Sequence, residues 1–242
     1  MAKRMPRGKP GSLARSPPAD ARLEPVPAAT TNPEEHAGGV RRTSEGESAA
    51  RRGRPGYDQR QILEIAVTVF IEHGYDATSV ASLAGRLGLT KSALYHHFTS
   101  KEHLLEVALD EALSGLEGVL TEPGAAEGSA GERLGYVLRG AVGVLVDRLP
   151  YVTLLLRVRG NSEVERRALE RRRAFDHEIT RLVRAAQAEG TVRADVDASV
   201  ATRLLFGMVN SIVEWYRPTG PEGAAELADD VLTVALDGLR PR

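Results

Sequence analysis

Residues 78–102 read TSVASLAGRLGLTKSALYHHFTSKE, two helical patterns with a glycine between them. Thr78 and Ser79 can accept backbone hydrogen bonds at a helix start, and apolar residues then recur at helical spacing. Gly88 stands where the chain must leave that helix with a positive φ, and Thr90 is placed to cap a second helix over about 91–97. The spacing therefore predicts two short helices joined by a sharp turn.

The second helix has the composition of a helix that reads DNA. Its outer face carries short hydrogen-bonding side chains, while Leu94 and Phe98 form a side that can pack. Residues near the start of a recognition helix meet base edges in the major groove, and hydroxyls and helix starts meet phosphates. A preceding apolar-striped helix that ends at His73 and Gly74 completes a three-helix core. The residues predicted to contact DNA are Thr78, Ser79, Thr90, Lys91, Ser92, Tyr95, His96 and Lys101.

The same residues resemble the TetR family of bacterial repressors. The resemblance covers about residues 57–105, from an IL-xx-A-xxx-F helix through GYDATSV to LAGRLGLTKSALYHHFTSKEHLL. One helix-turn-helix pattern alone is weak evidence, but here many constrained positions occur in order. The resemblance implies a repressor that binds a palindromic double-stranded DNA operator as a homodimer and is released by a small-molecule effector. The alternative is a helical small-molecule-binding or scaffold protein that does not bind DNA; a salt titration of duplex binding separates the two.

Positive charge is concentrated before this region. The formal net charge is -1, yet residues 1–56 hold 11 Lys and Arg against 6 Asp and Glu, whereas residues 57–105 hold 4 against 5. The leader also holds 8 of the 13 prolines and few large apolar residues, so we expect it to be disordered. Its basic end, Arg51, Arg52 and Arg54, is predicted to contact phosphates or an adjacent minor groove, with a solvated charge run as the alternative.

The rest of the chain is long enough for a second, larger domain. Helices are predicted at 133–149, 151–159, 162–188, 198–216 and 222–239, with a loop over 121–132 and no long alternating strand pattern. Ser100 is placed to cap a further helix that joins the two domains. The predicted fold is all-α, with a leader at 1–56, a three-helix DNA-binding domain with a helix-turn-helix at 57–103, and a larger helical ligand-binding and dimerisation domain at 104–242.

The last two helices carry broad apolar stripes. In a monomer both stripes could complete the core, but a two-fold bundle of these helices from two chains is the sharper interpretation, and the family resemblance favours it. A dimer would also place two recognition helices in successive major grooves of a palindromic site. The sequence therefore predicts a homodimer through its two C-terminal helices.

Effector-binding candidates combine an apolar body with a polar handle inside predicted core helices. A hydrogen bond satisfied within the core is the alternative role for each. The segment SIVEWYRPTGPE after Asn210 resembles the helix end of TetR relatives that respond to acyl-coenzyme A thioesters, which implies that ligand class. Arginines at 166, 167, 171, 172 and 173 alternate with glutamates, which favours an exposed salt-bridged face over a phosphate site. The candidates are Tyr136, Tyr151, Arg157, His177, Met208, Asn210 and Trp215.

Other chemistry has little support in the sequence. The chain has Cys 0, so it has no disulfide framework and no thiolate nucleophile, and it lacks a phosphate-cradling glycine loop. His96 and His97 are neighbours that point about 100° apart on a helix, so they do not share one metal-ligand face. The start of the chain has no apolar signal core and no apolar run is long enough to span a bilayer. We expect a cytoplasmic protein that is not an enzyme, takes no cofactor or metal, and has no membrane partner.

Overall fold

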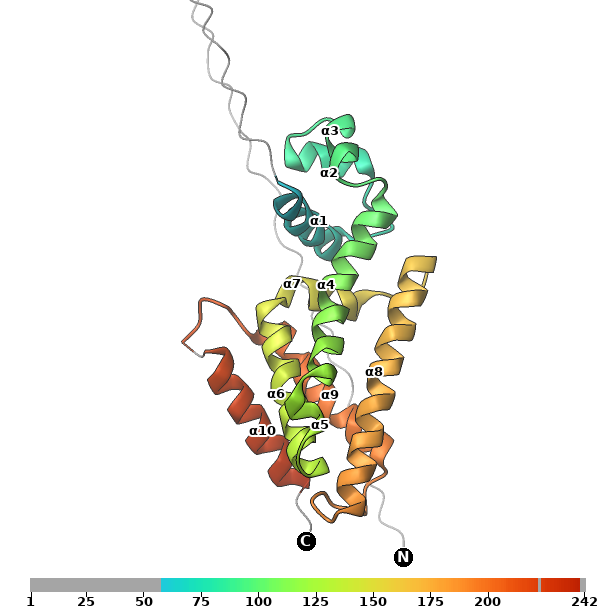
Figure 1. Cartoon of the computed structure of the whole chain (residues 1–242). Coiled ribbons are helices and arrows are strands. Elements are labelled where there is room, and N and C mark those ends of the chain that lie inside the picture. The colour runs from blue at the N-terminus through green and yellow to red at the C-terminus, as the bar shows by residue number, and fades with distance from the viewer. Residues whose placement is uncertain (1–57, 222, 240–242) are drawn as a thin grey trace, which may run out of the picture. The chain divides into compact units, whose positions relative to one another are not determined.

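The computed structural model describes residues 58–221 and 223–239, and within these ranges the regular structure is entirely α-helical. The predicted all-α fold is confirmed. Four helices, α1 to α4, lead from the DNA-reading region into the larger helical group, as Figure 1 shows. The helices are α1 (Gln59–His73), α2 (Val80–Leu87), α3 (Lys91–His97), α4 (Lys101–Thr121), α5 (Pro123–Ala126), α6 (Ala130–Asp147), α7 (Leu149–Arg157), α8 (Glu163–Ala188), α9 (Ala198–Trp215) and α10 (Ala224–Leu239).

Side-chain caps and one glycine set the ends of the first helices. Ser79 accepts from the Ser82 N–H at 3.0 Å to start α2, and Thr90 accepts from the Ala93 N–H at 3.1 Å to start α3. Between them Gly88 has φ 64°, a left-handed conformation that costs little without a Cβ. The predicted sharp turn and both predicted caps are confirmed.

The first three helices pack on the start of α4. Phe70, Leu83 and Phe98 are buried, and they share one apolar cluster with Leu104 and Leu105 of α4. Ser100 caps α4 by accepting from the His103 N–H at 2.9 Å, as predicted. Since α4 continues for 21 residues and packs on α6, α7 and α8, this single helix connects the first three helices to the larger group.

The larger group holds a second apolar cluster between α6, α8, α9 and α10. Leu134, Leu138, Ile179 and Val183 are fully buried there, and Leu205 of α9 packs with them. Burial of each such side chain contributes about 1.5–3 kcal/mol. α8 and α9 therefore lie side by side over a shared core, and the cleft described below opens between their exposed edges.

The predicted loop over 121–132 is wrong in part. Pro123 occupies the first turn of the short helix α5, where its missing N–H has no intrahelical partner to lose. Ser129 and Glu132 then form a capping box, with the Ser129 N–H donating to Glu132 at 2.8 Å, so α6 begins at Ala130. Glycine and alanine content suggested a loop, but the local caps outweigh that composition.

Candidate DNA interface and effector cleft

Helix α3 presents the exposed face that was expected to read DNA. Leu94 is buried beneath it, which leaves the other side of the helix open. Lys91, Ser92 and His96 are exposed, and Tyr95 is 48% exposed although its ring is large and apolar. These four side chains therefore share one accessible surface with hydrogen-bonding and cationic groups on it.

The two cap residues border this surface. Ser79 and Thr90 are exposed, and each uses a hydroxyl lone pair to hold the start of its helix. A hydroxyl that accepts one hydrogen bond still has a proton to donate, so capping leaves both groups able to bind a phosphate oxygen. Both helix starts point their free N–H groups in the direction that anions favour.

Two residues predicted to contact DNA, Thr78 and Lys101, make hydrogen bonds to main-chain carbonyls of the protein itself. Thr78 is 3% exposed, and its hydroxyl donates to the Gly74 carbonyl at 2.7 Å. The Lys101 ammonium donates to the carbonyls of Tyr75 and Thr78, each at 3.0 Å, and lies 4.1 Å from the Tyr75 ring centroid. Thr78 therefore closes the turn after α1 and Lys101 ties that turn to α4, while the DNA contacts expected of both residues stay predictions. Arg51, Arg52 and Arg54 lie outside the described residues.

The end of α1 and the turn after it also accept hydrogen bonds from residues of the larger helical group. The Arg157 guanidinium donates to the Ile71 carbonyl at 2.7 Å, and the Asn161 amide donates to Asp76 at 2.9 Å. The loop that carries Asn161 is itself fixed, because buried Glu165 accepts the N–H groups of residues 159, 160 and 161 at 3.2, 2.7 and 2.8 Å. Hydrogen bonds from α7 and from the loop before α8 thus hold the end of α1 and the turn that follows it.

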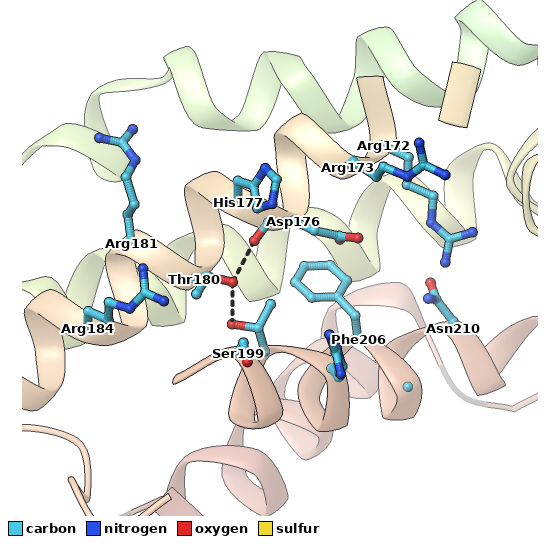
Figure 2. Close-up of a pocket in the computed structure, with 13 residues that line it drawn as sticks. Arg172, Arg173, Asp176, His177, Thr180, Arg181, Arg184, Ser199, Phe206 and Asn210 are labelled. Atoms are coloured by element: carbon cyan, nitrogen blue, oxygen red, sulfur yellow. Dashed lines mark hydrogen bonds between the residues drawn. The ribbon is translucent and has the colours of Figure 1, made fainter. Parts of the chain in front are cut away.

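A cleft of about 650 Å³ opens between α8 and α9, and Figure 2 shows the side chains around it. Its walls carry a concentration of positive charge with few carboxylates. Within the described part of the chain, the guanidinium groups at 172, 173, 184 and 203 make no hydrogen bond or ion pair of their own, whereas Arg181 pairs with Glu178. The cleft is lined by Arg172, Arg173, Asp176, His177, Thr180, Arg181, Arg184, Ser199, Thr202, Arg203, Phe206, Gly207 and Asn210.

The arginine run of α8 divides between two faces. Arg171 binds Glu117 and Asp110 of α4 at 2.7 and 2.8 Å, and these carboxylates raise the pKa of the guanidinium above its ordinary value. Arg166 and Arg167 likewise pair with carboxylates, at 2.7 and 2.9 Å. The predicted salt-bridged face holds for these three residues. It is wrong for Arg172 and Arg173, because a step of one or two residues along α8 turns them toward the cleft.

A small apolar cavity of about 30 Å³ lies deeper, behind the cleft. Leu116, Leu145, Leu155 and Val209 are among its walls, and its volume is that of about one water molecule. Phe206 packs edge-on against Phe175 with the ring centroids 5.5 Å apart. The residues that line both the cavity and the cleft form a neck between them: Arg172, Asp176, Phe206 and Asn210.

Only two of the predicted effector residues, His177 and Asn210, lie in the cleft. The Tyr136 hydroxyl of α6 donates a hydrogen bond to Glu122, and the Arg157 guanidinium donates one to a main-chain carbonyl of α1. Tyr151 lines a separate groove beside Arg60 and Glu111. Met208 packs against the core without lining the cleft, and Trp215 is 50% exposed at the end of α9. These five residues therefore lie outside the α8–α9 cleft, whose lining also includes Phe206, Asp176 and the cleft arginines.

The predicted apolar stripe of α9 also has two faces. Leu205, Val209 and Ile212 are buried in the core, whereas Val200, Leu204 and Trp215 are exposed. The three exposed residues lie within about 60° of arc at helical spacing, so they form one apolar face, called here the α9 outer face. Leu204 is 67% exposed, which is unusual for a leucine on an otherwise well-packed helix. On neighbouring α10, Val234 is exposed to a similar degree.

Among the described residues, neither a metal-binding cluster nor a membrane-spanning helix is found. No group of three or more His, Asp or Glu side chains there is arranged to hold a metal ion. In the same ranges, no helix combines the length and the apolar character needed to cross a bilayer.

Comparison with known proteins gives consistent matches in both halves. A family model described as bacterial regulatory proteins, tetR family, matches residues 62–108, and one described as tetracyclin repressor-like, C-terminal domain, matches residues 127–239. The crystal structure of SCO3833, a TetR-family member from Streptomyces coelicolor A3, is 56% identical and covers 74% of this chain and 90% of its own, with a TM-score of 0.70.

Two further matches carry functional names. The HTH-type transcriptional repressor KstR2 of Rhodococcus jostii is 29% identical over 189 residues, which are 74% of this chain and 89% of the repressor. The structure of AibR in complex with isovaleryl coenzyme A and operator DNA is 26% identical, with a TM-score of 0.61, and covers 73% of this chain and 96% of AibR. Both matches cover about three quarters of this chain.

Proposed function

This chain belongs to the TetR family of bacterial transcriptional regulators, and we propose that it is a homodimeric repressor released from its operator by an acyl-coenzyme A thioester. Its relatives are transcriptional regulators rather than enzymes, and DNA binding through the helix-turn-helix is their shared activity. The observation that carries the proposed effector is the α8–α9 cleft, where unpaired arginines stand outside an apolar cavity.

The proposed DNA contacts are the exposed residues of the helix-turn-helix. Lys91 and Ser92 begin α3 and are placed to meet phosphates and the first base edges, while Tyr95 and His96 extend the surface by one turn. Ser79 and Thr90 add hydroxyl donors at the two helix starts. The proposed domain division at residues 57–103 and 104–242 falls within the start of α4, so the DNA-reading unit ends where the connecting helix begins.

The proposed dimer forms through α9 and α10. The α9 outer face and Val234 would lose their contact with water against the same surfaces of a second chain, as a two-fold interface requires. Leu204→Asp places an unpaired charge in that seam and should weaken the dimer by about 2 kcal/mol or more, roughly 30-fold. Light scattering after size exclusion measures the mass, and Trp215 emission, from the only tryptophan, reports its burial.

A matched control for this test is Ala174→Asp, because Ala174 is exposed on α8 and belongs to neither the cleft lining nor the apolar clusters. It should remain dimeric. The proposed interface is wrong if the wild-type chain is monomeric at micromolar concentration, or if Leu204→Asp keeps its dimer mass and its Trp215 emission.

The chemistry of the cleft matches the two ends of a coenzyme A thioester. Such a ligand has several phosphate charges on the coenzyme and an apolar acyl group on the sulfur. Arg173, Arg184 and Arg203 can give those phosphates charge-assisted hydrogen bonds without breaking existing ion pairs. The acyl group would enter the apolar cavity and displace the Phe206 ring, since the cavity has no room for it otherwise. The coenzyme A complex of the relative AibR supports the same class.

Release would follow from the position of Phe206 on α9. A displaced ring pushes on the helix that carries the dimer face, and this changes the spacing of the two recognition helices. To move operator occupancy from 99:1 to 1:99, the effector must prefer the released form by about 5.5 kcal/mol. Several charge-assisted hydrogen bonds and a buried acyl group supply energies of that order.

The test uses the full chain and operator fragments captured from genomic DNA. Fluorescence anisotropy should show that isovaleryl- or longer acyl-coenzyme A releases the DNA, while coenzyme A alone acts more weakly because it leaves the cavity empty. Combining Arg184→Gln with Arg203→Gln should raise the half-release concentration by about tenfold. Arg167→Gln removes the same charge from α8 outside the cleft, where Arg167 pairs with Glu106, and should behave as wild type. DNA that stays bound at saturating acyl-coenzyme A refutes this effector class.

A further inference from the structure

The neck between the cleft and the cavity controls what can pass between them. Any ligand with its polar end among the cleft arginines and its tail in the cavity must place its linking group beside Arg172, Asp176, Phe206 and Asn210. In Figure 2 the Asp176 carboxylate projects toward the side of the cleft where Arg172 and Asn210 also lie. With the acyl tail in the cavity, the group that lies at the neck, called here the linking group, is the thioester of an acyl-coenzyme A. For a free acid, the group at the same place is its terminal carboxylate.

Asp176 is an unusual residue for this position. Its backbone carbonyl accepts from the Thr180 hydroxyl at 2.9 Å, but its carboxylate makes no hydrogen bond or ion pair within residues 58–221 and 223–239. The side chain is half-buried, and this burial raises the pKa of the carboxyl while Arg172 and His177 oppose the rise. A partly desolvated carboxylate without donors is unfavourable for the fold, so its presence here has no stabilising explanation.

We propose that Asp176 makes the neck select ligands whose linking group is uncharged, such as a thioester, and reject the matching free carboxylate. This rests on the proposed effector site. The Arg172 guanidinium can balance one negative charge at the neck, and Asp176 already supplies that charge. A second carboxylate would be held close to the first in a partly dry site, where like charges force one of them to take a proton or to leave. A thioester adds no charge.

Asn210 complements this selection. Its amide is an uncharged donor, and it can bind the carbonyl oxygen of a thioester without requiring a negative charge there. Replacing Asp176 with Asn removes the carboxylate and keeps the shape of the side chain. The guanidinium of Arg172 is then uncompensated, so the variant should accept a free acid at the neck.

The test compares matched ligand pairs by isothermal titration calorimetry on the full chain. Each pair is an acyl thioester of N-acetylcysteamine, which keeps the thioester but lacks the coenzyme phosphates, and the free acid of the same acyl group; isovaleryl and hexanoyl groups are used. The wild-type chain should bind the thioester at least about tenfold more tightly than the acid. In Asp176→Asn the acid should gain about tenfold in affinity, which removes most of the preference.

Two further variants locate the effect. Glu170→Gln removes a carboxylate from an exposed position of the same helix and should keep the wild-type preference. Adding Arg172→Gln to Asp176→Asn should abolish the gain for the acid, because the freed guanidinium is its expected partner. If acid continues to bind the double variant with the gained affinity, it binds elsewhere and the proposed role of Asp176 is wrong.

The outcomes separate this inference from the proposed effector. If thioesters bind and the preference is the same in Asp176→Asn as in the wild type, Asp176 does not set the selectivity, although the effector class stands. If neither the truncated thioesters nor isovaleryl-coenzyme A bind, the effector site fails and the selectivity fails with it.

Discussion

Lys101 and Lys91 are the two lysines of the described chain, and they should respond to the same substitution in opposite ways. Lys101 donates two hydrogen bonds at 3.0 Å from its ammonium to main-chain carbonyls and lies over the Tyr75 ring. Lys91 is exposed at the start of α3. Methionine keeps the apolar stem of either side chain and removes its charge, so each variant isolates the role of the ammonium.

The magnitude for Lys101→Met follows from its contacts. Hydrogen bonds to charged groups contribute about 1.5–3 kcal/mol each, and an exposed cation–π contact about 0.5–1 kcal/mol. Part of this is recovered, because the Tyr75 carbonyl keeps the Thr78 N–H at 3.1 Å and water can reach a partly buried site. We therefore expect a loss of about 2 kcal/mol in the free energy of unfolding. For a chain of this size that lowers Tm by about 4–8 °C.

The two variants are measured by urea denaturation, followed by circular dichroism, and by the salt dependence of operator affinity. Lys91→Met should lower the slope of log K against log salt by about 0.9 per protomer, about 1.8 per dimer, with stability unchanged within about 0.5 kcal/mol. Lys101→Met should leave the slope unchanged and lose stability. The opposite result, a reduced slope with full stability in Lys101→Met, would show that Lys101 binds phosphate and that its carbonyl contacts are unimportant.

Three further predictions concern the turn between α2 and α3, the loop held by Glu165, and the neck of the cleft. Gly88→Ala forces a Cβ into a left-handed backbone and should cost about 1–2 kcal/mol in thermal denaturation, with Gly88→Asn costing less; equal stability of all three would contradict the assigned φ. Glu165→Ala leaves three partly buried N–H groups without their acceptor and should cost about 3 kcal/mol, whereas Glu163→Ala, on the exposed face, should cost under about 0.5 kcal/mol; similar losses would refute the role of the Glu165 cap. Burial raises the pKa of Asp176, so the native state binds this proton more readily than the unfolded state, and stability falls as pH rises from about 3.9 through the raised pKa. Asp176→Asn should therefore raise Tm at neutral pH, and the gain should disappear below about pH 3.9; a lower Tm at pH 7 would show that the carboxylate stabilises the fold.

Local chemistry explains why the helix ends of the reader were predictable. Ser79, Gly88, Thr90 and Ser100 each act on backbone groups within four residues, so the sequence contains both partners of every contact. Thr78 shows the limit. It is as good a cap as Ser79 by composition, but the turn after α1 directs its hydroxyl inward to Gly74, and only the packed structure decides between the two.

The cleft was less predictable because its residues are selected by contacts between helices. The glutamates that pair with Arg167 and Arg171 lie on α4, not on α8, so the alternating charges of α8 did not reveal which arginines remain free. A broad apolar stripe also conceals which side of α9 faces the core. The sequence therefore predicts a pocket role for Trp215, which is exposed, and does not indicate Phe206, which has no polar group but lines the cavity.

Helix α9 carries Phe206 toward the cleft and Leu204, two residues earlier, away from the core. Phe206 of the proposed ligand site and Leu204 of the proposed subunit seam thus lie on nearly opposite sides of a single helix about ten ångströms thick. Filling one site should therefore be felt by the site in the other subunit, giving a dose–response curve whose Hill coefficient differs from one. Substitutions at the seam that tighten the dimer would therefore also change the effector concentration needed for release. They would do so without altering any group that contacts the effector.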